Sequence, residues 1–498
     1  MKRILLLVIG FAPILTVLVW VSAQALASAA ERQVTYRYIS DALSPVATKY
    51  NAVQWLTPTV PLVRAYTSGD GDRIGQAMMD AWQALSVAQS SGRTDILTDA
   101  FSGVALERAL LSVEDAQAHG GRMAVLSQTA RPVFYHLDGS VFQAEVEMLV
   151  ARYASDENGL IHHEVSRDTG VVTLMNETTG WRVFSYERRA AEPIAPSGAG
   201  WQTQVLNGVN YYPAESPWRD FWPTFDAKQI AIDFDRVRSL EANSVRVFLT
   251  REDFINPAES RDALANLATL LSLAEEAGLR VVPTLFDLRH DYGPGLWAAD
   301  TDYLARVLPV LAASSAVEFV DLKNEPDLDF ETHGRGKVEA WIRTMTDVSR
   351  TFAPDLALTV GWSAAEAATI AADTLDVVTY HDYAPLEGTQ ERLADVRRAV
   401  AGRDVLITEI GASSFEISAS LPGSPQAQAE ALSTRLTALE KADGVFVWAL
   451  YDFPNVDGSV VGGSPWVQRL QAEFGLFTYD GTEKPAAEAV RRSFASEP

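Results

Sequence analysis

Two glutamates each end a short apolar run of the kind that forms a buried strand. Glu325 stands in the stretch DLKNEPD and Glu409 in the stretch VLITEIG. A carboxylate buried without a partner is costly, but at the carboxyl end of a parallel barrel strand it faces the site that the loops build. Glycoside hydrolysis with retention needs such a pair, one acid to protonate the leaving oxygen and one carboxylate roughly 5 Å away to attack the anomeric carbon. The two glutamates therefore indicate sugar chemistry, although either alone is equally explained as a solvated strand end.

The elements that would hold these glutamates follow residue 200, where strand and helix patterns alternate eight times. Such alternation over about 300 residues predicts an α/β fold, a (β/α)8 TIM barrel that spans residues 201–498. With this register Glu325 follows the fourth strand and Glu409 ends the seventh, so both are expected at one end of the barrel. The predicted strands are 206–211, 244–250, 279–286, 317–323, 356–361, 375–381, 404–410 and 444–450.

A smaller α+β domain is predicted over residues 34–189, before a Pro- and Gly-rich linker at 190–200. Helical spacing comes first and alternating strand patterns follow, an order typical of an α+β unit. This order is similar to that of a nuclear-transport-factor-2-like cone. Because no acid and base converge in it, we expect the domain to position the barrel or bind an envelope protein rather than to catalyse. The predicted helices are 70–89 and 93–101, the predicted strands are 123–137, 141–153, 171–175 and 181–186, and His162 and His163 fall in a polar hairpin connection.

The composition excludes one class of partner. The 498 residues carry a formal charge of -24, which opposes nucleic-acid binding because polyphosphate recognition relies on clustered Lys and Arg. The chain has no cysteine, so neither disulfides nor a thiolate metal site can contribute to the fold. A neutral or soluble substrate is therefore expected.

Residues 1–30 predict export. Two basic residues precede an uncharged run whose most apolar part is 4–21, and residues 27–29 supply the small side chains of a cleavage site. This pattern is typical of a signal peptide, but the apolar run approaches the length that spans a bilayer. Two outcomes therefore stay open, a cleaved signal with a periplasmic or secreted product, and an inner-membrane anchor through residues 4–21.

The stretch around Glu325 also carries a family resemblance. Asn324-Glu325-Pro326 after the fourth strand, together with a glutamate on the seventh, resembles glycoside hydrolase clan A, and the further motifs resemble family 5 over about residues 201–495. The resemblance implies that Glu325 is the acid/base and Glu409 the nucleophile.

Two further residues have physical roles beside this pair. Arg246 on the second strand would hold a neighbouring carboxylate ionised, unless it forms an ordinary structural ion pair. Asn324 can donate its amide to the sugar 2-hydroxyl, a bond that strengthens in the transition state. We also expect the pKa of Glu325 to exceed that of Glu409, because a second negative charge is disfavoured while Arg246 favours ionisation of Glu409.

The remaining substrate contacts are implied by the resemblance. The family's His-x-Tyr motif matches His381 and Tyr383, which would bind the reacting sugar and hydrogen-bond the nucleophile. His290, just past the third strand, matches a substrate-contacting histidine, with a surface histidine as the alternative. Trp448, at the end of the eighth strand, matches the platform on which the family stacks the sugar, with a barrel-core tryptophan as the alternative.

Further aromatic residues fit a cleft for a sugar chain, or packing between the domains. They are Tyr211, Tyr212, Trp218 and Trp222 near the first strand, with Trp297 and Trp362 as lesser candidates.

The sequence thus predicts a retaining endo-glycanase-like hydrolase of a β-linked glucan or mannan, with no cofactor and no metal. Two alternatives stay open. A transglycosylase would pass the same glycosyl-enzyme to another sugar, and a non-catalytic envelope protein would only bind carbohydrate. The first domain, in place of a polysaccharide-binding module, favours an envelope enzyme that trims exopolysaccharide over a free degrading enzyme.

Overall fold

The computed structural model describes residues 53–156, 158–178, 180–194, 198, 200–201, 204–255, 260–288, 291–400, 402–416 and 423–495. The predicted signal or anchor in residues 1–30 and the predicted substrate contact His290 lie outside these ranges. Within them, no helix combines the length and the apolar character that a bilayer crossing requires.

The first domain is a sheet of five strands in the order β1 to β5, with three helices ahead of β2 in the chain. The long strands β2 to β5 pair antiparallel, whereas the two-residue β1 pairs parallel with β2. The order of helices and then strands is confirmed, while the likeness to a nuclear-transport-factor-2-like cone stays a prediction. The elements are β1 (Gln54–Trp55), α2 (Ser68–Ser91), α3 (Leu97–Ala100), α4 (Gly103–His119), β2 (Gly121–Tyr135), β3 (Val141–Asp156), β4 (Gly159–Glu177) and β5 (Gly180–Pro193).

Local sequence explains where the long helix α2 begins and ends. Thr67 and Asp70 form a capping box at its start, in which each side chain accepts a hydrogen bond from the other's backbone N–H. Gly92 ends the helix in the left-handed conformation, with a φ of 75° that favours glycine.

Two expectations for this domain are wrong. His162 and His163 lie inside β4, which runs from Gly159 to Glu177, rather than in a hairpin connection. The strand was missed because its first half is rich in polar side chains and lacks the regular alternation of apolar residues. In addition, β5 continues to Pro193 and so takes up the first part of the predicted linker.

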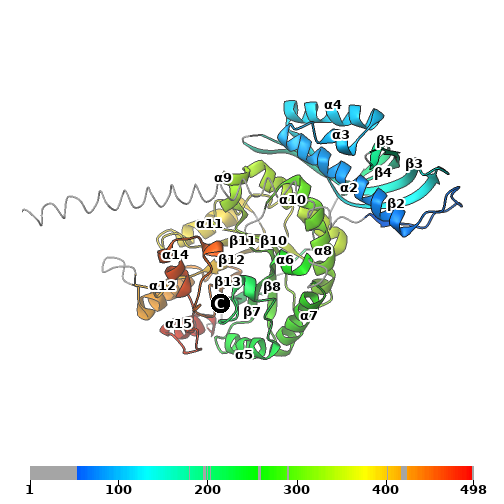
Figure 1. Cartoon of the computed structure of the whole chain (residues 1–498). Helices are drawn as coiled ribbons and strands as arrows, with labels where there is room; N and C mark the ends of the chain where they lie inside the picture. The colour runs from blue at the N-terminus through cyan, green and yellow to red at the C-terminus, as the bar shows by residue number, and fades with distance from the viewer. Residues whose placement is uncertain are drawn as a thin grey trace, which may run out of the picture.

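The second domain is a closed barrel of eight parallel strands, β6 to β13 in chain order (Figure 1). Every predicted strand overlaps an observed one, so the predicted fold class is confirmed. The strands are β6 (Leu206–Tyr211), β7 (Ser244–Phe248), β8 (Arg280–Phe286), β9 (Val320–Asn324), β10 (Leu358–Trp362), β11 (Val378–His381), β12 (Val405–Ile410) and β13 (Gly444–Val447).

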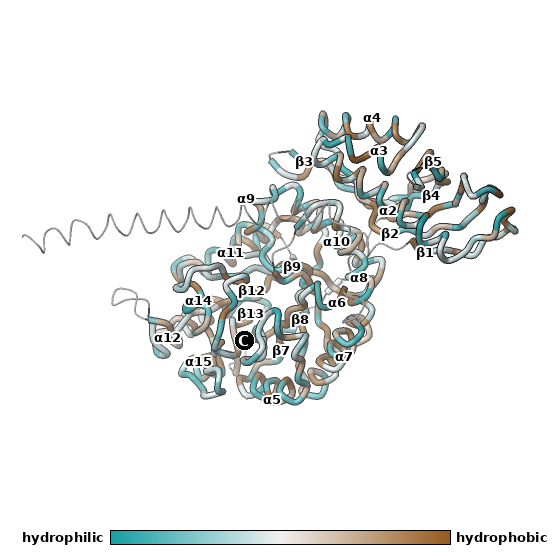
Figure 2. Tube along the Cα trace, in the orientation of Figure 1, coloured by the Kyte–Doolittle hydropathy of each residue, from teal (hydrophilic) through white to brown (hydrophobic). Residues whose placement is uncertain are grey.

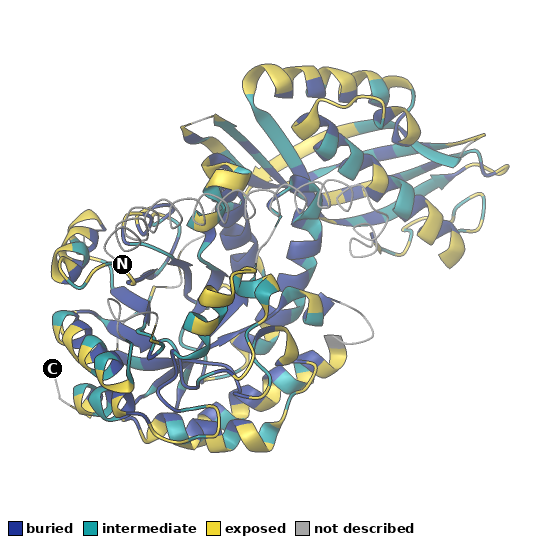
Figure 3. Ribbon diagram, turned by 60° about the vertical axis from the view of Figure 1, so that its left-hand side comes forward, coloured by how far each residue is buried: buried dark blue, intermediate teal, exposed yellow. Residues whose placement is uncertain are grey.

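Helices alternate with these strands and form the outside of the barrel. They carry hydrophilic and hydrophobic residues in alternation (Figure 2), and their exposed residues face outward while the strands are buried (Figure 3). Burial on both faces explains why the strands read as continuous apolar runs. The main helices are α5 (Ala227–Arg238), α6 (Arg251–Ile255), α7 (Ser260–Ala277), α8 (Trp297–Ala312), α10 (Arg335–Phe352), α11 (Thr389–Ala399), α12 (Pro425–Ala438), α13 (Gly458–Val461), α14 (Pro465–Ala472) and α15 (Pro485–Ala495), with η2 (Trp218–Asp220), η3 (Pro294–Leu296), η4 (Pro326–Asp329) and α9 (Phe330–His333) in loops.

The sheet of the first domain has a core on each face. One face packs against α2, α3 and α4 in a core of its own. The other face packs against α8 and α10 of the barrel and joins the barrel core (Figure 1), where the rings of Tyr153 and Trp297 stack with centroids 5.1 Å apart. The sheet residues in that shared core are Ala124, Leu126, Ala151, Tyr153 and Val165.

Candidate active site

Arg246 is the centre of the polar cluster at the carboxyl ends of the barrel strands. Its side chain is fully buried in β7. Nη1 donates to Glu409 Oε1 at 2.6 Å, and Nη2 donates to Asp321 Oδ2 at 2.7 Å. One guanidinium therefore joins β9 to β12 and contacts Glu409, while the role expected of Arg246 in the reaction stays a prediction.

The same guanidinium orients two amides. Arg246 Nη1 donates to Asn210 Oδ1 at 3.0 Å, and Nη2 donates to Asn324 Oδ1 at 2.9 Å. Because its oxygen accepts from Arg246, the Asn324 side chain keeps its Nδ2 as a donor for another group. This orientation is the one that a bond to a sugar hydroxyl requires.

Glu409 is held through both of its carboxylate oxygens. Oε1 accepts from Arg246, and Oε2 accepts from Tyr383 Oη at 2.9 Å. Glu409 is nearly fully buried, whereas Tyr383 is 41% exposed. Tyr383 therefore connects the buried carboxylate to the open end of the barrel, in the position predicted for it.

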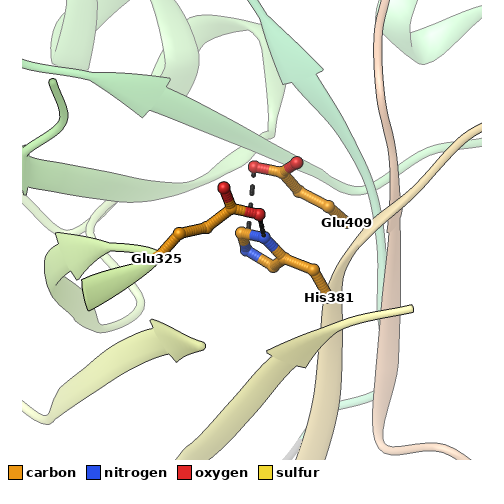
Figure 4. A group of neighbouring side chains, drawn as sticks. All are labelled: Glu325, His381 and Glu409. Carbon is orange, nitrogen blue, oxygen red and sulfur yellow. Dashed lines mark hydrogen bonds and ion pairs between the residues drawn. The ribbon is translucent and has the colours of Figure 1, made fainter. Parts of the chain in front are cut away.

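Glu325 follows β9 in the left-handed conformation, with a φ of 48°. His381 Nδ1 lies 2.7 Å from Glu325 Oε1, and His381 Nε2 lies 3.6 Å from Glu409 Oε1. Figure 4 shows the imidazole between the two carboxylates, with an interaction to each. An oxygen of Glu325 and an oxygen of Glu409 lie within 4.8 Å of each other, so the barrel brings together two carboxylates that stand far apart in the sequence.

Opposing influences act on the pKa values of Glu325 and His381. Burial raises the pKa of Glu325, but the hydrogen bond from His381 and the charges of His381, Arg246 and Lys323 outweigh it and hold that pKa below its usual value. Burial lowers the pKa of His381, but the charge of Glu409 and the bond to Glu325 raise it overall. The sequence did not reveal this hydrogen bond from His381, and the expected order of the pKa values of the two glutamates stays a prediction.

Trp448 lies at the same end of the barrel, half-buried beside Phe248. The two ring centroids are 5.8 Å apart and nearly perpendicular, and the Arg246 guanidinium lies 4.6 Å from the Phe248 centroid. Trp448 thus borders the cluster without a hydrogen bond to either glutamate, as a stacking platform would.

Glu325, His381 and Glu409 also come close enough together for a cation. The donor set fits a metal poorly, because His381 Nδ1 already contacts Glu325 and the positive charge of Arg246 lies against Glu409. The geometry is better described as a network of ion pairs.

Sequence reasoning missed three supporting groups. Asp321 is fully buried and accepts from Arg246, from Thr284 Oγ1 and from the backbone N–H of Gly361. A carboxylate inside an apolar strand was the signal that could have revealed it. Gly361 is the second missed group. It leaves room for the site, because a Cβ at this position would lie only 3.1 Å from Arg246 Nη2 and from His381 Nε2.

The buried Lys323 is the third missed group. Its Nζ donates to the backbone oxygens of Asp287 and Asn324. It thereby ties the end of β9 to the end of β8.

Several aromatic candidates are core residues rather than cleft residues. Trp218 and Trp222 are buried, and Trp222 Nε1 donates to Phe248 O at 2.9 Å. Trp297 packs between the domains, and Trp362 is buried in the barrel.

A closed parallel barrel with a glutamate after its fourth strand and another on its seventh agrees with the resemblance to glycoside hydrolase clan A. No family model and no curated protein matches the chain. Solved structures that resemble it in fold are glycoside hydrolases. An exo-β-1,4-mannosidase from Opitutaceae bacterium strain TAV5 is 21% identical, with a TM-score of 0.49, over 60% of this chain and 62% of that chain.

Two more solved structures show a similar likeness. A GH5_18 structure from Streptomyces cattleya with Manβ1-4GlcNAc is 22% identical, with a TM-score of 0.48, over 59% of this chain and 82% of that chain. A β-glucuronidase from Bifidobacterium dentium is 15% identical, with a TM-score of 0.47, over 76% of this chain and 66% of that chain. At such values a shared barrel fixes neither reaction nor substrate, so function has to be argued from the site.

Proposed function

We propose that this chain is a retaining glycoside hydrolase that cleaves a β-linked glycan through a covalent glycosyl-enzyme. The observation that carries the proposal is the spacing of the two carboxylates, whose nearest ligand atoms lie within 4.8 Å. A retaining enzyme has its carboxyl groups about 5 Å apart, whereas an inverting enzyme leaves room for a water molecule between them.

In the first step Glu409 attacks the anomeric carbon as Glu325 protonates the leaving oxygen. Arg246 and Tyr383 hold the carboxylate of Glu409 in position, through hydrogen bonds of 2.6 Å and 2.9 Å. The anomeric carbon gains a bond to Glu409 and loses its bond to the leaving oxygen, which departs as a hydroxyl. Asn324 Nδ2 is the donor for the sugar 2-hydroxyl.

In the second step water replaces the glutamate. Glu325 takes a proton from the water, whose oxygen bonds to the anomeric carbon as the ester bond to Glu409 breaks. At a pH between 4.5 and 6.5, the ordinary pKa values of the two groups, the raised pKa of His381 and the lowered pKa of Glu325 leave a proton on His381 beside an ionised Glu325 in the free chain. Transfer of that proton across the 2.7 Å contact prepares Glu325 as the acid when substrate displaces water.

The finer parts of the proposal concern substrate and place. The stacking position of Trp448 supports a pyranose in the reacting subsite. The uncharged run in residues 4–21 and the small residues at 27–29 support export to the periplasm or beyond, with an exopolysaccharide as the substrate. Fractionation of cells that express the full chain tests export, since a product confined to the cytoplasm contradicts it.

The test of the reaction is a pair of Glu409 variants. Glu409→Gln is expected to fold, since the amide keeps the shape of the side chain, and to lose turnover by about a thousandfold or more because no ester forms. Glu409→Ala with azide should restore cleavage of an activated aryl β-glycoside and yield the α-glycosyl azide, as NMR of the product shows.

Matched variants of Glu325 complete this test. Glu325→Ala should still release dinitrophenol from a dinitrophenyl glycoside and form the glycosyl-enzyme, because this leaving group needs no proton, and should lose cleavage of the unactivated glycan. Near-normal turnover by Glu409→Gln, or net inversion by the unaltered chain, would refute the retaining mechanism.

A further inference from the structure

Trp466 is the exposed tryptophan of the part of the chain that the structure describes. Its residue is 63% exposed, whereas the barrel tryptophans Trp218, Trp297 and Trp362 are buried. It stands in the first turn of α14, after β13, and therefore on a loop at the carboxyl end of the barrel. Its exposed aromatic face is available for stacking against a ligand at this end of the barrel.

The segment that carries Trp466 is joined to the loop that follows Glu409. Ser413 Oγ donates to Leu470 O at 2.8 Å, and the backbone N–H of Ser414 donates to Glu473 O at 2.9 Å. The loop after β12, the strand that bears Glu409, is thus joined to the segment after β13, which runs from Trp448 to Trp466 and beyond.

Two pairs of aromatic rings lie beside this contact between the loops. Tyr383, bonded to Glu409, lies 6.2 Å from Phe474 between ring centroids, and Phe474 packs where a Cβ on Gly411 would meet it. In the second pair, the ring centroids of Phe415 and Trp466 lie 6.2 Å apart. The bond between Ser414 and Glu473 connects the two pairs, since these residues are adjacent to Phe415 and Phe474.

Arg469 adds polar chemistry beside the outer rings. Its guanidinium lies 5.6 Å from the Phe415 centroid, and its residue is exposed. A guanidinium stacked on a ring is held in place while its N–H groups still reach out to acceptors. Rings that take the apolar faces of a pyranose, with a donor for its hydroxyls at their edge, suit a sugar better than an aliphatic ligand.

We propose that Trp466 and Phe415, with Arg469 at their edge, form a distal sugar subsite that holds the β-linked glycan beyond the reacting unit. This inference rests on the proposed function and deepens it, because it makes the substrate a chain of several sugars. The hydrogen bonds of Ser413 and Ser414 hold the segment of Trp466 against the loop that follows Glu409, and the proposed occupant is one extended glycan that contacts both.

The test measures binding in the Glu409→Gln chain, so that no substrate is consumed. Calorimetric titrations use β-1,4-linked manno- and gluco-oligosaccharides, from disaccharide to hexasaccharide. In that background Trp466→Ala should weaken hexasaccharide binding about tenfold, the loss typical of a buried aromatic anchor. The loss should shrink toward the disaccharide, which is too short to reach it, and Trp466→Phe should recover most of the affinity.

Tyr479→Ala serves as the matched control, because Tyr479 is also exposed, at 56%, but does not belong to the proposed subsite of Trp466, Phe415 and Arg469. It should bind all lengths as the parent does. An equal loss at every length, no loss at any length, or no binding of either series would overturn the subsite. Hydrolysis of an aryl β-glycoside by the unaltered chain tests the reaction separately, so binding without turnover refutes the proposed function and keeps the subsite.

Discussion

At the scale of single residues, one buried arginine organises the site. Arg246 spreads its donors over Asp321, Glu409 and two amides, so each acceptor is satisfied by a group that is rigid in the core of the barrel. A lysine would bring the same charge but only a point contact, because the planar fork of arginine is what reaches several acceptors at once.

Arg246→Lys is therefore expected to lower both the stability and the activity of the protein. It should lower the free energy of unfolding by about 1–3 kcal/mol, because an acceptor loses its partner, and lower kcat at least tenfold as Glu409 loses its orientation. Urea unfolding and kinetics on an aryl glycoside measure both. Arg350→Lys is the control, since Arg350 forms a similar buried pair with Asp376, 3.0 Å apart, ahead of β11.

The control variant should lose comparable stability and keep kcat. If both variants lower kcat equally, the effect of Arg246 comes from general loosening of the barrel and its role at Glu409 is refuted.

Tyr383 offers a cleaner probe of the nucleophile. Tyr383→Phe removes one hydroxyl from a partly exposed ring and leaves Glu409 without its 2.9 Å donor. A hydrogen bond to a charged group contributes about 1.5–3 kcal/mol, so kcat should fall roughly tenfold to a hundredfold. The melting temperature should hardly change. An unchanged kcat would show that the bond is absent when substrate is bound.

At the scale of elements, irregular strand ends aim the reacting side chains. The register shifts between Tyr380 and His381 of β11, between Thr359 and Gly361 of β10, and between Ile407 and Ile410 of β12. All three irregularities lie at the carboxyl ends of the strands. A bulge there redirects the side chain that follows it, which explains how His381 and Glu409 both face Glu325.

Another pair of elements, β4 and α10, buries two titratable groups between the domains. His163 Nε2 lies 3.0 Å from Thr344 Oγ1, and His163 Nδ1 lies 3.9 Å from Asp347 Oδ2. Burial, then the charges of Arg343 and His162, lower the pKa of His163 to about 4. Burial raises the pKa of Asp347 to about 7, against the charges of Arg350 and Arg343. Both groups are therefore neutral near pH 6, so the contact is not an ion pair.

The opposite pKa shifts of His163 and Asp347 predict a pH dependence of stability that shows only when one of the two residues is replaced. Between pH about 4 and 6.5 the folded chain holds one proton, on Asp347, and the unfolded chain also holds one, on the histidine, so the two contributions cancel. In Asp347→Asn only His163 remains. Its pKa is lower in the folded state, so stability should rise with pH over that window, by at most about 1.4 kcal/mol per pH unit.

In His163→Gln the sign reverses. The pKa of Asp347 is higher in the folded state, so its contribution is present below pH 3.8 and is lost as pH rises toward about 7. Urea unfolding of the parent and both variants across this range measures the slopes. Equal slopes in all three chains would contradict the buried pair.

At the scale of the whole molecule, the first domain is packed against the barrel and not only tethered to it. One face of its sheet shares a core with α8 and α10, and the Tyr153–Trp297 stack lies in that core. The hydrogen bonds around Glu325 and Glu409 all come from barrel residues. The domain therefore contributes stability, while its expected role in positioning the enzyme or binding a partner stays a prediction.

A chain that begins at Gly200 tests this division. A Pro- and Gly-rich linker is typical of domains that fold with separate cores, but removal of the sheet would expose Trp297 and its neighbours in the shared core. We expect the shortened chain to melt at a lower temperature and bind the dye ANS, yet to cleave short aryl glycosides while folded. A melting temperature equal to that of the full chain would contradict the shared core.

The sequence by itself determined the strands of the barrel and the two glutamates, because both are local. Strands buried on both faces read as apolar runs, and a charge at the end of such a run, as in Glu325 and Glu409, marks the mouth. The family resemblance carried by the motif around Asn324 added the expected substrate contacts His381, Tyr383 and Trp448, which no local pattern predicts.

Only the tertiary structure decided which groups meet. The partners of Arg246 come from three other strands, the hydrogen bond that lowers the pKa of Glu325 comes from His381, and the burial of His163 comes from a helix that lies far along the chain. No local pattern encodes these contacts, because closure of the barrel and docking of the sheet bring together side chains whose own neighbours in sequence are unrelated to them.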